Sequence, residues 1–346
     1  MKSLKLFSLA FFTYLILTLY TNIFLKDKLY AAELDMSRIW VASLIALLFF
    51  GFFVLGFIKP VELPQWSYWL IISFLSLSIG IWGLGATLIV FLISKKYHSF
   101  KDYAGLSFFF SLFLIVAIYM LVGVPIFEWG LRFRLSKILV FLAFLSSISL
   151  VYVNWNIKFK TLAFLILEML FFLGTFRSLM LLVFLMYILP FYFEKRLTLD
   201  KICLAIPVLL LILYLSGSLE GLLVRIGFTF LIFHNLVHVS MPFGFFHGRL
   251  LLHSDPRWRV AFMFTLKNRY TYFLFGQPIA DFGIFGVVEA YFLGTLLKLS
   301  ERDVKTTTIV LSTLIYAIES GIDAFLLSVL VLFGALYSKT NIETLK

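Results

Sequence analysis

The sequence is short of cysteine, of charge and of the common catalytic motifs. Cys203 is the only cysteine in 346 residues, which excludes an internal disulfide and a CxxC metal site. HExxH, GxSxG, Walker A and GxGxxG patterns are all missing, so the usual hydrolase, NTPase and dinucleotide-binding machinery is not present. Only 14% of the residues are charged, against about 25% in soluble domains, and no soluble fold fits this composition.

The residues that are abundant are apolar. They make up 62% of the chain, the mean hydropathy is +1.04, and runs of about 20 apolar residues recur from end to end. The first run, 4–25, is too long for the apolar core of a signal peptide and has no small-residue cleavage site, so it predicts a first membrane span. We therefore expect one all-α, polytopic integral membrane domain over residues 1–346.

Apolar runs bounded by charges predict about eleven transmembrane helices. The last two are separated only by Glu319-Ser320-Gly321 and could form a kinked hairpin. The predicted spans are 4–25, 39–58, 68–93, 103–124, 136–153, 161–175, 178–193, 202–217, 279–297, 307–320 and 322–337.

The distribution of Lys and Arg predicts the orientation of these spans, because cytoplasmic loops carry the excess of positive charge. One set of alternate loops holds 16 of the 29 basic residues, the opposite short loops hold 7, and the other 6 lie in residues 218–278. This count predicts an external N-terminus, a cytoplasmic C-terminus and a large external loop at about 218–278. Since the net charge of +11 is spread over short loops, we expect no nucleic-acid partner.

The external loop at 218–278 differs in composition from the rest of the chain. It holds four of the five histidines and six cations. Residues 222–241 are apolar enough to enter the membrane, but a single crossing there would reverse the side of every later loop. An amphipathic or re-entrant helix is therefore the favoured prediction.

Cations at membrane boundaries are candidate functional residues, because they are costly there. Arg132 and Arg134 follow Gly123-Val124-Pro125-Ile126-Phe127, where either snorkelling or an anion-binding role would explain them. Arg177 lies in the turn Gly174-Thr175-Phe176-Arg177-Ser178, before a helix that would aim its amides at the same anion. Arginine in this setting favours a phosphate contact.

The external loop adds further candidates for binding an anionic headgroup. They are Arg225, Arg249, Arg257 and Arg259. His234 and His238 are four residues apart, on one face of a helix, but no third ligand stands at a metal-binding spacing. We therefore expect two histidines that face a cavity, and no metal site.

Three segments resemble the O-antigen polymerase family, also called oligosaccharide repeat-unit polymerases. Val122–Phe127 is similar to the family's Gly-Ile-Pro-Leu stretch, and Gly174–Ser178 to its Gly-Ser-Arg-Gly turn, with Ser178 in place of the second glycine. Asp281–Gly286 is similar to its Phe-Gly-x-x-Gly segment. The related ligases place His-Asn shortly before this last segment, whereas His234-Asn235 lies far upstream, which favours a polymerase.

The resemblance implies a metal-independent membrane glycosyltransferase without a cofactor. Its substrate would be a polyprenyl-pyrophosphate-linked oligosaccharide, joined into longer chains at the outer face of the cytoplasmic membrane, with flippase and chain-length regulator proteins as candidate partners. A ligase-like transferase and a lipid-linked oligosaccharide flippase or transporter remain the alternatives. Against a transporter, no internal repeat is visible and the cations gather at one face.

Such a transfer needs cations for the departing pyrophosphate and a base for the acceptor hydroxyl. Arg177 and Arg225 are the first candidates for the pyrophosphate, and the other arginines of the outer loops follow. The candidates for the base are Asp255, Asp281, Glu220, His234 and His238, and the sequence does not choose among them.

Overall fold

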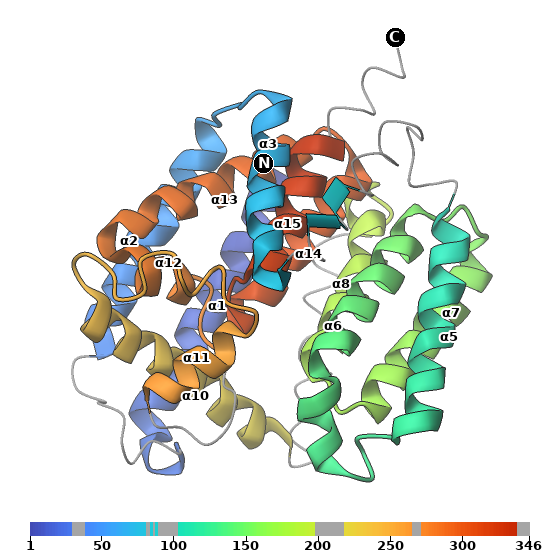
Figure 1. The fold of residues 1–346 in the computed structure, drawn as a ribbon, viewed down its shortest axis with the longest axis horizontal. Helices are drawn as coiled ribbons and strands as arrows, with labels where there is room; N and C mark the ends of the chain where they lie inside the picture. Colours follow the sequence, from blue (N-terminus) through green and yellow to red (C-terminus); the bar gives the residue numbers. More distant parts are fainter. Residues whose placement is uncertain are drawn as a thin grey trace. The chain divides into compact units, whose positions relative to one another are not determined.

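The computed structural model describes residues 1–29, 39–80, 84–85, 87–88, 103–197, 218–264 and 271–337. Over these ranges the chain is helical and contains no strand. It divides into two compact units, which are described separately: unit 1 comprises Met1–Ile89 and Leu197–Lys346, and unit 2 comprises Val90–Arg196 (Figure 1). The expectation of a single membrane domain stays a prediction.

Among the described residues, six helices are long and apolar enough to cross a membrane. A helix satisfies its own backbone hydrogen bonds, which is the condition for crossing lipid. They are Lys2–Phe24, Ile39–Ile58, Ala104–Val122, Gly130–Tyr152, Leu219–Ser240 and Gly276–Ser300. The structure therefore agrees with an all-helical polytopic membrane protein, while the number of eleven spans stays a prediction and the expected span 202–217 lies outside the described residues.

The described part of unit 2, residues 103–196, consists of four helices joined by short turns, so that consecutive helices run in opposite directions (Figure 1). The helices are α5 (Ala104–Val122), α6 (Trp129–Tyr152), α7 (Ile157–Leu173) and α8 (Arg177–Phe193). Helix α6 packs on α5 and α8, and α7 packs on α8. The turns 123–128 and 174–176 consequently lie at one end of unit 2, and residues 153–156 lie at the other.

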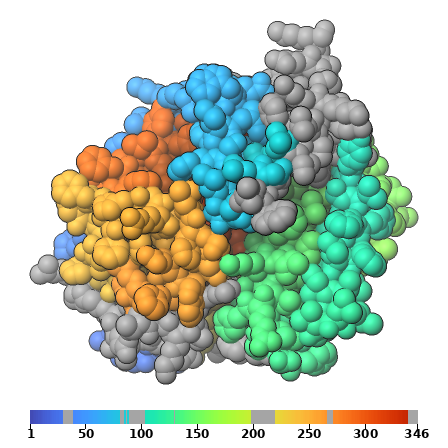
Figure 2. Space-filling view, viewed as in Figure 1, coloured from blue at the N-terminus to red at the C-terminus, as the bar shows by residue number. Residues whose placement is uncertain are grey.

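Unit 1 contains the first helices of the chain and the described helices from Ser218 onward. The early elements are α1 (Lys2–Phe24), η1 (Lys26–Lys28), α2 (Ile39–Ile58), α3 (Gln65–Ser76) and η2 (Leu77–Ile79). The late elements are α10 (Ser218–Ser240), α11 (Pro256–Met263), α12 (Gly276–Phe282), η4 (Gly283–Gly286), α13 (Val287–Ser300), α14 (Val304–Ser320), α15 (Ala324–Val331) and η5 (Leu332–Leu336). The loop 241–255 and α11 lie on the viewed face of this unit (Figure 2).

Phenylalanine rings fill the core of unit 1. The rings of Phe11 and Phe50 lie 4.4 Å apart between centroids and connect α1 to α2. Phe273, in the segment before α12, extends this cluster to Phe230 and Phe233 of α10. These rings are fully or almost fully buried, so the aromatic richness of the chain serves packing here.

Two glycines allow α2 and α13 to pack backbone against backbone. A Cβ atom on Gly56 would collide with the carbonyl oxygen of Tyr291, and one on Gly294 would collide with that of Phe53. Small residues are the usual means of such close approach between membrane helices. The register of α2 on α13 therefore depends on these two positions.

The ion pairs of unit 1 contradict the predicted sorting of its loops. The terminal ammonium of Met1 contacts Glu301 at 2.6 Å, and Arg302 pairs with Glu62, so these groups share one end of the unit. At the other end, Lys28 pairs with Glu220 at 2.6 Å. The sequence assigned Met1 and Glu301 to opposite sides of the membrane, and Lys28 and Glu220 as well.

The cause of this error is the counting of complete crossings. The prediction treated nearly every apolar run as one complete crossing, although α3, which begins the run 68–93, has 12 residues and part of that run lies outside the described residues. At 1.5 Å per residue, a helix needs about 20 residues to cross about 30 Å of hydrocarbon. An external N-terminus together with a cytoplasmic 298–305 loop is therefore wrong.

Substituting alanine for Gly56 or Gly294 should destabilise the protein by about 1–3 kcal/mol, because the added methyl group forces the two helix backbones apart. The matched control is Gly51→Ala in the same helix α2, where a Cβ meets nothing within 4 Å and helix propensity improves. Thermal unfolding of the purified protein in detergent measures the difference. Equal melting midpoints for all three variants would contradict this account of the packing.

Candidate functional site

The turn after α5 brings the first sequence motif to the end of α7. Gly123 ends α5 at a φ of 111°, and the amide of Phe127 donates to the carbonyl of Val124 at 3.0 Å. The amide of Ile126 then donates to the carbonyl of Leu173 at 3.0 Å. Segments about 50 residues apart in sequence thus meet at one end of unit 2.

The second motif forms a tight turn at the same end. Thr175 has a φ of 61°, and the amide of Phe176 returns to the carbonyl of Phe171 at 3.0 Å. Gly174 is required because a Cβ there would lie 2.5 Å from the hydroxyl oxygen of Tyr119. Helix α8 then begins directly at Arg177.

Arg132 joins the two motifs. Its guanidinium carbon lies 5.5 Å from the centroid of the Phe176 ring, the residue that precedes Arg177. Arg134 and Arg177 are exposed. Three predicted anion-binding arginines therefore lie in the two segments that meet at this end, which we call the arginine end of unit 2.

Helices α6 and α8 both begin at the arginine end. Their N-cap residues, Glu128 and Phe176, make no capping hydrogen bond through a side chain. The first amides of both helices are therefore not satisfied by their own caps, and the helix dipoles add positive potential. Two helix N-termini and three arginines suit a phosphate or pyrophosphate group.

In unit 1, Asp281 fastens the loop 241–255 to α12. Its two carboxylate oxygens accept hydrogen bonds from the amides of Leu250 and Leu251, each at 2.9 Å, and the Gln277 side chain donates to one of them at 2.9 Å. Asp281 is completely buried. A carboxylate with this many donors and no exposure is suited to hold the loop, and is poorly suited to accept a proton from a substrate.

The turn between α14 and α15 supplies acids for two of the predicted arginines. Arg225 Nε lies 2.5 Å from Glu319 Oε1, and both side chains are largely buried. Arg257 lies beside Asp323 and Tyr316. Burial alone would lower the pKa of Arg257, but these neighbours together raise it above its ordinary value, so the guanidinium stays charged.

Asp255 and the two histidines predicted to face a cavity have separate places in unit 1. Asp255 caps α11 by accepting from the amide of Trp258 at 3.2 Å, and its own amide donates to His253 Nδ1 at 3.0 Å. His234 is buried, whereas His238 is exposed. The two histidines that share a helix spacing therefore have different surroundings.

Arg249 and Arg259 are the exposed arginines of this loop. The Arg259 guanidinium carbon lies 5.8 Å from the Phe246 ring centroid, and the Arg249 amide donates to the carbonyl of Phe246 at 3.0 Å. Phe246 is buried, so it fixes the base from which both arginines extend. Of the four predicted arginines of unit 1, these two reach the surface most freely.

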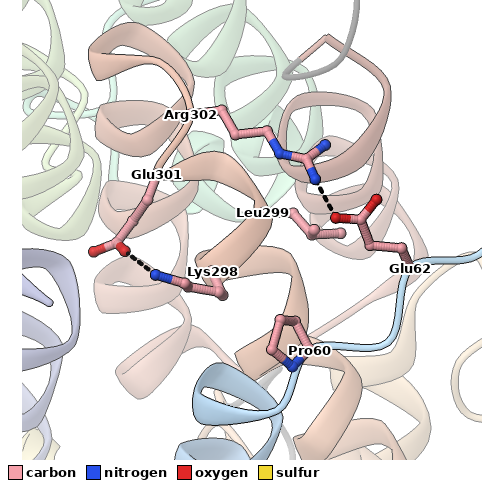
Figure 3. Close-up of a pocket in the computed structure, with 6 residues that line it drawn as sticks. All are labelled: Pro60, Glu62, Lys298, Leu299, Glu301 and Arg302. Atoms are coloured by element: carbon pink, nitrogen blue, oxygen red, sulfur yellow. Dashed lines mark hydrogen bonds and ion pairs between the residues drawn. The ribbon is translucent and has the colours of Figure 1, made fainter.

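A hollow of about 260 Å³ lies at the opposite end of unit 1 (Figure 3). Its charged lining residues neutralise one another: Lys298 contacts Glu301 at 2.9 Å and Arg302 pairs with Glu62. Burial would raise the pKa of Glu301, but hydrogen bonds from Lys298, the terminal ammonium and Ser3 hold it below its ordinary value. This hollow is far from the predicted chemistry, and its paired charges favour a structural role.

Several residues that shape these sites were missed by the sequence reasoning. Glu319 was read only as part of a kink and Asp323 was not considered, because their partners Arg225 and Arg257 are distant in sequence. Gln277 was not considered either, although its partner Asp281 lies four residues after it. Glu128 was overlooked as well, although its position four residues before Arg132 offered a signal. In the described part of the chain, no group of three His, Cys, Asp or Glu side chains could hold a metal ion.

The geometry defines a class: a multi-pass membrane protein with arginines gathered at helix ends, suited to an anionic headgroup. A family model described as "Putative O-antigen polymerase" matches residues 6–333, nearly the whole chain. The chain belongs to the O-antigen polymerase family, which confirms the resemblance and indicates polymerisation of lipid-linked oligosaccharide repeat units in the membrane. No curated protein and no solved structure matches it.

Replacing Asp281 by Asn should release the loop 241–255, because an amide group cannot accept from both Leu250 and Leu251. The expected cost is about 1–3 kcal/mol. Hydrogen exchange at the Leu250 and Leu251 amides measures it, with Asp27→Asn, an exposed aspartate of η1, as the control. Unchanged exchange at both amides would contradict the anchoring role.

A double-mutant cycle should show that Arg225 and Glu319 stabilise each other. We expect a coupling of about 1–3 kcal/mol between Arg225→Ala and Glu319→Ala, because the pair is shielded from water. The control cycle uses Lys28 and Glu220, an exposed pair with an expected coupling below about 1 kcal/mol. Thermal unfolding in detergent is the measurement, and equal couplings in the two cycles would argue against a shielded pair.

Proposed function

We propose that this chain is a metal-independent glycosyltransferase that joins polyprenyl-pyrophosphate-linked oligosaccharide repeat units. The transfer takes place at the outer face of the cytoplasmic membrane. The observation that carries the proposal is the arginine end of unit 2, where the Arg132 guanidinium lies over the ring of Phe176, the residue before Arg177, and where α6 and α8 begin. Membership of the O-antigen polymerase family supports the same reaction class.

The reaction moves a growing glycan from one lipid pyrophosphate to the sugar of another. As the glycosidic carbon separates from the pyrophosphate, negative charge develops on the leaving oxygen. Arg177 and Arg132 stabilise that charge from fixed positions, and the free amides of α8 point at the same region. The activated bond of the donor supplies the driving force, so neither ATP nor a nucleotide sugar is required.

The arginines of unit 1 divide into two roles under this proposal. Arg249 and Arg259 are exposed and contribute to binding an anionic headgroup. Arg225 and Arg257 are held in place by the acids of the α14–α15 turn. Because one carboxylate already compensates each of these two, we rank them below Arg177 for direct contact with pyrophosphate.

We also propose an orientation for unit 1 that replaces the predicted one. The end with α10, α11 and the loop 241–255 faces outward, and the end with Met1, Glu62 and Arg302 faces the cytoplasm. One reason is that the exposed arginines should lie on the same side of the membrane as the lipid-linked substrate. A second reason is that the cytoplasmic end then carries basic residues, as the positive-inside rule requires: Lys59, Lys298, Arg302 and Lys305.

Replacing Arg177 by Ala should leave single-repeat products in place of long chains. Loss of one preorganised charge stabiliser costs roughly 10²–10³ in rate. Arg177→Lys should recover part of the activity, because lysine restores charge without the planar bidentate geometry. The measurement is glycan chain length in cells together with the amount of protein in the membrane.

The matched control is Arg196→Ala at the other end of unit 2, where Arg196 pairs with Glu194 at 3.1 Å. It removes the same side chain from the same unit and should leave chain length unchanged. Long chains in both Arg177 variants would refute the proposed function. Repeat units that stay inaccessible from outside the cell would instead indicate a flippase.

A further inference from the structure

We propose that Glu128 is the general base that takes the proton from the acceptor sugar's hydroxyl group. This inference rests on the proposed function, and it names a residue in a role that the sequence left open. Glu128 precedes α6 at the arginine end of unit 2, four residues before Arg132. Its side chain is exposed and makes no capping hydrogen bond.

The backbone holds Glu128 close to the start of α8. Ile126, two residues earlier, donates its amide to the carbonyl of Leu173 at the end of α7. On the other side of Glu128, the guanidinium of Arg132 lies over the ring of Phe176. The backbone of Glu128 therefore lies between two residues whose contacts both reach the turn that carries Arg177.

The other carboxylates that the sequence predicted as candidate bases make structural contacts. Asp281 is buried under three hydrogen bonds, and Asp255 caps α11. Glu220 pairs with Lys28 at 2.6 Å. Each of these would have to give up a structural contact before it could accept a proton.

Within the described part of unit 2, few carboxylates could serve as the general base. Its carboxylates are Glu128, Glu168 and Glu194. Glu194 follows α8 and pairs with Arg196 at the end opposite the arginine end, and Glu168 lies along α7, six residues before Gly174. Glu128 alone among these three stands where Arg132 and Arg177 would hold the pyrophosphate.

The chemical step balances with this assignment. The acceptor hydroxyl oxygen forms a bond to the anomeric carbon of the donor glycan, and the bond from that carbon to the pyrophosphate oxygen breaks. The electron pair leaves with the polyprenyl pyrophosphate, whose charge Arg177 and Arg132 stabilise. The hydroxyl proton passes to the Glu128 carboxylate and from there to water, so that no oxidant or other co-reactant is needed.

The test uses the full-length protein in lipid vesicles with lipid-linked repeat units purified from cells that lack it. Glu128→Gln keeps the size of the side chain but cannot accept the proton. We expect turnover to fall at least about 100-fold while KM changes less than about threefold, because a positioned base contributes typically 10²–10⁴ in rate. Glu128→Asp should recover part of the turnover.

Glu194→Gln is the matched control, since it makes the same change at the opposite end of unit 2 and should leave turnover unchanged. Melting midpoints verify that each variant is folded. Because the Glu128 side chain is exposed and makes no capping hydrogen bond, we expect its replacement to leave the melting midpoint unchanged. Glu128→Gln with normal turnover overturns the assignment, as does a variant that raises KM alone. If Arg177→Ala still abolishes polymerisation in that case, the proposed function stands; if it does not, the proposed function fails as well.

Discussion

A chain surrounded by lipid must satisfy its own backbone hydrogen bonds, and this constraint decides where chemistry can be placed in this protein. Regular helix occupies the apolar runs, so irregular backbone and polar side chains are confined to helix ends. Gly123, Gly174 and Gly321 each stand at such an end, two of them with positive φ. The arginines and acids of the candidate sites follow directly after these breaks or lie against them.

The arginines of the two units differ in whether a carboxylate neutralises their charge. In unit 1, the short turn between α14 and α15 supplies one acid to Arg225 and another to Arg257. In unit 2, Arg177 at the arginine end is exposed, and the preceding residue, Phe176, packs its ring against the Arg132 guanidinium. Buried guanidinium groups need a carboxylate to remain there, whereas an exposed one can exchange water for a phosphate.

Sequence reasoning succeeded where the signal was local and failed where it required counting across the whole chain. The two motifs around Gly123 and Gly174 were recognised as helix ends, and the Arg132 guanidinium does lie over the ring of Phe176, the residue before Arg177. The sides of the loops were assigned by alternation, and one misjudged crossing reverses every later loop. The pair Met1 and Glu301 shows that error directly. Asp281 was nominated as a base because its burial and its three donors cannot be read from a linear pattern.

The sequence by itself determined that this is an all-helical membrane protein with cations at helix ends, because hydrophobic run length and charge placement are local properties that lipid imposes. It also carried the family resemblance. Only the tertiary structure decided which acids hold Arg225 and Arg257, that Asp281 anchors a loop, and that Glu128 stands beside the turn before Arg177. These relations join residues distant in the chain, and packing sets them rather than any periodicity.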